Sequence, residues 1–265
     1  HVYVLNNNVF YDITPLRKTT ANLSNPLVVT NGSATVTVTD SSHGASTGDF
    51  IIINSATTTG GITAANLNRL EGYQITKVNA NSYTFVAPSS ASSGATGGGT
   101  TIDIGYLIGN AEKVGSASSD PALGWGVGSW GEDGWGEAAD TGSSTVNLEA
   151  TQWSLVLWGE DVILNNRNGQ LYYWDTSDSS DTTRAALISA ETGASGVPVS
   201  VRTITVSFPD RHLIAGGCTN LSGSEVDPML IRFANQEDFT QFTPTSTNTA
   251  GDQRLEVGTK IISMI

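Results

Sequence analysis

The sequence predicts an all-β protein. Charged residues make up only 14% of its 265 residues, glycine is abundant with 29 copies, and amphipathic runs rich in Ala, Leu, Glu and Lys are almost absent. Segments such as SATVTVTD (33–40) alternate Val with small or hydroxyl residues, and this period of two marks a half-buried strand. Composition and periodicity therefore favour strands joined by many turns over helices.

The N-terminal residues predict a β-hairpin. Two β-rich runs, VYVL and VFYDI, are joined by Asn6, Asn7 and Asn8. Asparagine tolerates the left-handed backbone conformations that tight turns need. We expect residues 1–24 to be propeller-like strands that form part of a blade, because they resemble strands of the units that repeat later in the chain.

Residues 25–101 predict a small inserted β-sandwich or barrel module. Thr63 is placed to cap one short helical turn, and His43 opens a turn that we expect it to cap. The low-complexity stretch SSASSGATGGGT (89–100) is expected to be a flexible return. The predicted strands lie at 33–40, 50–54, 72–78 and 82–88.

Residues 102–265 predict a Trp/Gly-rich linker followed by propeller-like blades. The segment 153–175 has the order strand, acidic turn, strand, Asn/Gly turn, strand, and residues 202–235 repeat this order. Units of this size with three or four antiparallel strands are typical of propeller blades. The chain ends in a further strand pattern, GTKIISMI (258–265), so we expect it to be a piece of a longer polypeptide. The predicted architecture is a partial β-propeller-like body with an inserted module.

The ribbon GWGVGSWGEDGWGEA (124–138) spaces Trp125, Trp130 and Trp135 five residues apart, a period that matches neither helix nor strand. Binding of single-stranded nucleic acid is disfavoured because the ribbon has no cation beside its rings. A sugar platform stays open, although few neighbours can bind hydroxyls. We favour packing or interface anchors, because Trp is enriched at such positions. The same role is predicted for Trp153, Trp158, Trp174, Phe239 and Phe242.

Catalytic constellations are not evident in the sequence. Adjacent acids, as in Glu160-Asp161, point to opposite faces of a strand and do not form an acid–base pair. The loop DTSDSSD (175–181) lacks the glycine and glutamate of a calcium loop, so we favour a polar loop over a metal site. Cys218 follows Ala-Gly-Gly at the end of an apolar strand, which favours a buried residue over a nucleophile paired with His212. We predict no enzymatic activity, no metal and no cofactor.

The charge balance limits the classes of partner. The formal net charge is −13, and no cluster of Lys and Arg occurs. Such a surface repels nucleic acid, so sequence-specific DNA or RNA binding is disfavoured. The single cysteine excludes an intrachain disulfide, and no apolar run is long enough to span a membrane.

Four stretches carry a resemblance to a known family: VFYDITPLR (9–17), the Trp ribbon, 153–175, and 233–261. Together they resemble the tail nozzle or hub (tail tubular) proteins of short-tailed bacteriophages. In that family a strand is followed by a D/N-Q-x-D-F-x-x-W/F-x-P segment and a Gly-Asp-Gln stretch. The matching residues here are Asn235, Gln236, Asp238, Phe239, Phe242, Pro244, Gly251 and Asp252, with Phe242 where a Trp often stands.

The resemblance implies a non-enzymatic structural protein of the virion tail. Copies would form a ring, a hexamer in the family, around a channel for DNA ejection, and would contact other tail proteins such as an adaptor and fibres. DNA would pass without sequence-specific binding, as acidic walls favour. Glu132, Asp133, Glu160 and Asp161 are then candidates to face the channel. The alternative is a host-receptor or glycan-binding tail protein whose Trp ribbon contacts sugar.

Overall fold

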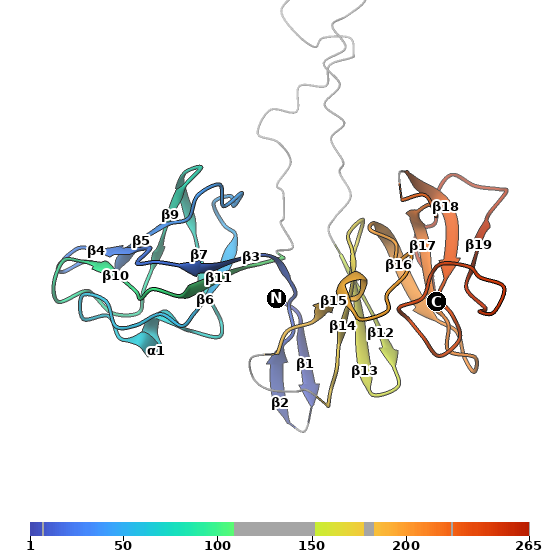
Figure 1. The fold of residues 1–265 in the computed structure, drawn as a ribbon, viewed down its shortest axis with the longest axis horizontal. Coiled ribbons are helices and arrows are strands. Elements are labelled where there is room, and N and C mark those ends of the chain that lie inside the picture. Colours follow the sequence, from blue (N-terminus) through green and yellow to red (C-terminus); the bar gives the residue numbers. More distant parts are fainter. Residues whose placement is uncertain (7, 109–151, 178–182, 224, 265) are drawn as a thin grey trace, which may run out of the picture. The chain divides into compact units, whose positions relative to one another are not determined.

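The computed structural model describes residues 1–6, 8–108, 152–177, 183–223 and 225–264 (Figure 1). Within these residues, helix is limited to α1 (Ala64–Leu67) and one 3-10 turn, η1 (Ile188–Ala190). The other regular elements are strands, and they pair in antiparallel sheets. The prediction of an all-β chain is confirmed.

Two sheets enclose the core of the inserted module. One has the strand order β3-β11-β6-β7, and the other has the order β10-β4-β5-β9-β8. Their strands are β3 (Leu16–Leu23), β4 (Leu27–Val29), β5 (Thr35–Thr39), β6 (Phe50–Asn54), β7 (Tyr73–Gln74), β8 (Thr76–Asn79), β9 (Ser82–Val86), β10 (Ala95–Gly97) and β11 (Ile102–Leu107). The alternation in β5 is as predicted: Val36 and Val38 are buried, and the threonines that alternate with them are exposed or partly exposed.

The limits of the module's sheets differ from the sequence-based expectation in two places. β3 and β11 pair with each other, and β11 also pairs with β6, so the strand pairing extends past positions 25 and 101. The stretch 89–100 is not merely a flexible return, because it contains β10, which pairs with β4. Its small residues permit close packing. A side chain at Gly98 would not fit, because its Cβ would lie only 2.5 Å from the Ile102 side chain. The division of the chain into domains stays a prediction.

The N-terminal hairpin is confirmed. β1 (Tyr3–Asn6) and β2 (Val9–Asp12) pair in antiparallel register, with Leu5 opposite Phe10. Asn8, in the turn, has a φ of 63°, the left-handed conformation that asparagine tolerates.

Two four-stranded meanders follow in the C-terminal part, as the repeated pattern predicts. The first sheet contains β12 (Trp153–Trp158), β13 (Asp161–Asn166), β14 (Leu171–Trp174) and β15 (Ala186–Leu187). The second contains β16 (Val201–Val206), β17 (Leu213–Thr219), β18 (Val226–Phe233) and β19 (Gly251–Arg254). In each sheet every strand pairs with the next one along the chain, which is the connectivity of a propeller blade.

The strand β13 of the first sheet is covered on both faces. Ile163 of β13 joins a core shared with the second sheet, whereas its neighbours Val162 and Leu164 join a core shared with the hairpin residues Val2 and Ile13. Because successive side chains of a strand point to opposite faces, the apolar run of β13 contributes to both cores.

The final segment corrects one expectation. No strand occurs at 258–264, where the apolar pattern predicts one. Ile261 N instead donates to Pro228 O, and Met264 packs on the second sheet at Gly216, where a Cβ would lie 2.9 Å from the sulfur. The apolar side chains therefore cover a sheet face and do not extend its edge.

Candidate functional site

An aromatic seam joins the first and second sheets. We use this name for Trp158, Tyr173, Phe239 and Phe242. The Phe239 ring stacks on Tyr173 with centroids 4.5 Å apart and meets Trp158 edge-on at 5.5 Å. Phe242 is fully buried in the same core. Trp158 and Tyr173 come from the first sheet and the two phenylalanines from the loop after β18, so the rings hold the two sheets together.

A charged pair covers the outer end of the seam. The Arg211 guanidinium lies 5.0 Å above the Trp158 ring, within the range of a cation–π contact. Its Nη1 atom is also 3.3 Å from Glu237 Oε2. Both residues have positive φ angles, 46° and 58°, and lie in tight turns. The pair shields the rings from water on this side.

Asp161 is bound inside the chain. Its carboxylate accepts hydrogen bonds from the Tyr173 hydroxyl at 2.7 Å and from the backbone N–H and hydroxyl of Thr176, both at 3.0 Å. Partial burial raises the pKa of Asp161, but these hydrogen bonds and the nearby Arg211 outweigh it, and the pKa is lowered from its ordinary value of 3.8. Glu160, in the turn before it, is exposed.

A second seam joins the first sheet to the N-terminal hairpin. Trp174 is fully buried, its indole N–H donates to Thr183 O at 3.3 Å, and its ring lies 5.8 Å from that of Tyr11. Trp153 packs partly buried against the same core. The described aromatic residues for which we predict packing or interface roles therefore all contact the cores of this chain.

Several predicted site residues lie outside the described residues. These are Trp125, Trp130, Trp135, Glu132 and Asp133. Sequence reasoning missed Tyr173 and Arg211. The alternation in LYYW places Tyr173 on the same face as the core residue Leu171, which was a usable sign, whereas nothing in the sequence links Arg211 to Trp158.

Neither Cys218 nor Tyr173 has the lowered pKa that a nucleophile requires. Cys218 is buried, as predicted, and burial raises the pKa of its thiol to about 12. Burial and the hydrogen bond to Asp161 likewise raise the pKa of Tyr173 above its ordinary value. A reactive thiol or phenol requires a lowered pKa, so both groups are protonated and weak nucleophiles at neutral pH.

The histidines of the described residues have structural partners. His43 caps its turn as predicted: Nδ1 accepts from Ala45 N, and Nε2 lies 2.9 Å from Asn79 O. His212 Nδ1 bonds Ala234 O at 2.8 Å. Among the described residues, no group of three or more His, Cys, Asp and Glu side chains is arranged to hold a metal ion. Asp178 and Asp181 of the polar loop lie outside the described part.

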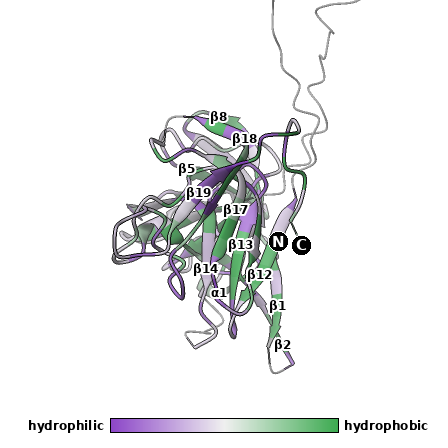
Figure 2. Cartoon of the chain, turned by 90° about the vertical axis from the view of Figure 1, so that its right-hand side faces the viewer, coloured by the Kyte–Doolittle hydropathy of each residue, from purple (hydrophilic) through white to green (hydrophobic). Residues whose placement is uncertain are grey.

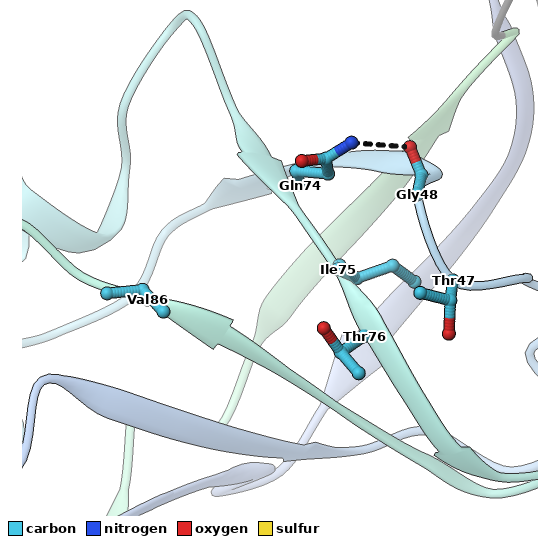
Figure 3. Close-up of a pocket in the computed structure, with 6 residues that line it drawn as sticks. All are labelled: Thr47, Gly48, Gln74, Ile75, Thr76 and Val86. Carbon is cyan, nitrogen blue, oxygen red and sulfur yellow. Dashed lines mark hydrogen bonds between the residues drawn. The ribbon is translucent and has the colours of Figure 1, made fainter.

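A shallow cleft lies in the module where the chain passes from one sheet to the other. Ile75 separates β7 from β8, and the cleft beside it has a volume of about 400 Å³ (Figure 3). Gln74 Nε2 donates to Gly48 O at 3.4 Å across one wall. The lining residues are Thr47, Gly48, Gln74, Ile75, Thr76 and Val86. None of them is charged or aromatic, so the cleft has no group for acid–base chemistry or sugar stacking.

Exposed apolar side chains were not foreseen from the sequence. They include Tyr3, Leu5 and Phe10 on the hairpin and Leu155 and Leu157 on β12. β12 has the sequence WSLVLW, which is mostly apolar on both faces (Figure 2). This pattern could have indicated that the strand has an exposed apolar face. No helix among the described residues has the length and apolar character needed to cross a bilayer.

Comparison with known proteins adds little. No protein-family model matches the chain, and no curated protein matches it. Among solved structures, the chain is similar to an endosialidase of phage phi92, with 14% sequence identity over 92% of this chain and a TM-score of 0.29. It spans 32% of the length of that chain. At this TM-score and identity the similarity carries no argument for a shared activity.

Proposed function

We propose that this chain is a non-enzymatic structural protein of a phage tail, in which it forms part of the nozzle or hub that conducts DNA during ejection. The observation that supports this best is the pair of consecutive four-stranded meanders joined by an aromatic seam. Such units would form a rigid wall of the conduit. The sequence resemblance to tail nozzle proteins supports a location in the tail.

The charge of the chain fits a conduit. A net charge of −13 opposes adsorption of DNA to the walls, so DNA passes without being held. Of the acidic pair at the β12–β13 turn, Asp161 is engaged by Tyr173 and Thr176. The exposed Glu160 is therefore the better candidate to face a channel, and copies of the chain arranged in a ring would repeat it around the bore.

The location test is immunogold electron microscopy of purified particles of the phage that encodes the chain. Antibody raised against the chain should label the tail of intact virions, and absence of the full-length protein from purified virions would overturn the proposal. Removal of the gene should give particles that package DNA but fail to retain or deliver it. Binding of the purified chain to host glycans, lost in Trp130→Ala, would instead support a receptor-binding role.

A further inference from the structure

The loop between β5 and β6, residues 40–49, contains a buried histidine. His43 is fully buried, although most of the loop around it is exposed. Its imidazole contacts the Tyr83 ring of β9 edge-on at 5.1 Å and stacks on the Tyr106 ring of β11 at 6.5 Å. Both tyrosines belong to the core of the module, so the histidine fixes the loop to that core.

The hydrogen-bond partners of His43 determine which of its nitrogens carries a proton. Nδ1 accepts the Ala45 N–H at 2.9 Å, so Nδ1 has no proton of its own. Nε2 lies 2.9 Å from Asn79 O, a carbonyl oxygen that can only accept, so Nε2 carries the proton. The closed loop therefore holds a single neutral tautomer of the imidazole.

A second proton on the imidazole is incompatible with this arrangement. A charged imidazole has two donors and no acceptor, so its Nδ1–H would face the Ala45 N–H. Ala45 is itself fully buried, and its N–H would be left without a partner. Protonation of His43 therefore favours conformations in which the loop opens and water reaches the ring.

Cations bind the loop on both sides of His43. Arg17 Nη1 donates to Gly44 O at 3.2 Å. Lys18 Nζ donates to Ser42 O at 3.1 Å. These positive groups oppose a further positive charge on the imidazole between them. The ionisable residues of the loop and of the neighbouring positions of β3, β8, β9 and β11 are Arg17, Lys18, Asp40, Asp49, Lys77, Tyr83 and Tyr106.

The carboxylates of the loop are engaged by other groups. Asp40 accepts a hydrogen bond from the Tyr106 hydroxyl at 2.5 Å, and Asp49 pairs with Arg17 at 2.8 Å. Both nitrogens of the imidazole bond backbone groups, so neither carboxylate accepts a hydrogen bond from it. Burial raises the pKa of Tyr83 and of Tyr106, so both rings are neutral at physiological pH.

We propose that His43 is an acid-sensitive latch of the module, whose protonation opens the loop 40–49. The open loop binds more protons than the closed one, because only there can the imidazole take up its second proton. Closure is therefore favoured as the pH rises and is lost as the pH falls through about 6.5, the ordinary value for an exposed histidine. This inference is independent of the proposed function, because it concerns the module alone.

The test is hydrogen–deuterium exchange of the full chain, read by mass spectrometry on peptides that cover residues 40–49. Exchange at about pH 7.5 and about pH 5.5 is normalised to the denatured chain at the same pH, which removes the intrinsic pH dependence. Protection of the loop should fall by about tenfold at the lower pH, the factor expected when only the open form is protonated. Residues 201–206 of β16, outside the module, should show no such fall.

His43→Asn tests the role of the imidazole, because asparagine keeps an acceptor for the Ala45 N–H but takes up no proton. Protection of its loop should be the same at both pH values. His212→Asn is the matched control, since His212 also bonds a backbone carbonyl, Ala234 O, but lies outside the module. Its loop 40–49 should keep the full acid response. Circular dichroism confirms that each variant folds.

Nitrogen-15 NMR of the imidazoles provides a test that needs no variant. The chain has three histidines, and His43 should carry its proton on Nε2 alone at about pH 7.5. A charged imidazole at about pH 5.5 in a loop that stays protected would overturn the latch. Loop protection that does not change with pH, or a fall that persists in His43→Asn or extends equally to residues 201–206, would overturn it as well.

Discussion

Arg232 is fully buried in the second sheet and is bound by carbonyl groups. Its guanidinium donates to Thr219 O at 3.2 Å, Gly196 O at 2.6 Å and Phe242 O at 3.2 Å. Arg232→Met removes these donors and leaves buried carbonyls unpaired, so we expect the free energy of unfolding to fall by about 2–4 kcal/mol. Urea denaturation measures this change.

The matched control for Arg232 is Arg254→Met. Arg254 is 62% exposed and pairs with Asp227 at 2.7 Å, an arrangement whose loss costs less than about 1 kcal/mol. Arg232→Lys keeps the charge but loses the forked donor geometry, so it should resemble Arg232→Met. Equal, small losses in Arg232→Met and Arg254→Met would show that the carbonyl contacts contribute nothing.

Asp161 should make stability depend on pH. Its pKa in the folded chain is lowered, so its contribution is present above its ordinary value of 3.8 and is lost as the pH falls through the folded-state value. Asp161→Asn should therefore be less stable than the unaltered chain at pH 7, and the difference should shrink in acid below about pH 4. Urea midpoints at several pH values measure it, with the exposed Glu160→Gln as control. A difference that is constant with pH would contradict this account.

At the scale of elements, Phe239 connects a loop of the second sheet to the first. Phe239→Ala removes the stacking on Tyr173 and the edge contact with Trp158. Because Phe239 is only partly buried, we expect a loss of about 2–3 kcal/mol in unfolding free energy. Tryptophan fluorescence should also shift to longer wavelength as Trp158 becomes more exposed. Val257→Ala, at an exposed position, should change neither quantity; a Phe239→Ala chain that behaves like this control would contradict the seam.

Local patterns predicted several elements but not their partners, and they failed for β10 and for the strand expected at 258–265. The alternation at 33–40, the Asn turn of the first hairpin and the Thr63 cap of α1 depend on neighbours in sequence, and each is found. The pairing of β10 with β4 and of β3 with β11 joins residues far apart in the chain, and no local pattern specifies it. Arg211 and Trp158 are also far apart in the sequence, so no local pattern predicts their contact.

At the scale of the whole molecule, the described residues form separate apolar cores. The core of the module includes Tyr83, Phe85 and Tyr106, and none of its members belongs to the cores of the first and second sheets. The six tryptophans all lie outside residues 16–107. Tryptophan fluorescence therefore reports on the part outside the module, while far-ultraviolet circular dichroism reports on both parts.

This separation predicts that the module unfolds as its own cooperative unit. Phe85 is buried with its ring 4.2 Å from that of Tyr73, so Phe85→Ala should destabilise the module by about 3–5 kcal/mol. Urea titration should then show an earlier transition by circular dichroism while the midpoint by tryptophan fluorescence stays unchanged. Phe242→Ala, in the core of the first and second sheets, should instead lower the urea midpoint by tryptophan fluorescence and leave the transition of the module unchanged. If either variant moved both midpoints together, the chain would unfold as one cooperative unit, and the module would depend for its stability on the sheets that follow it.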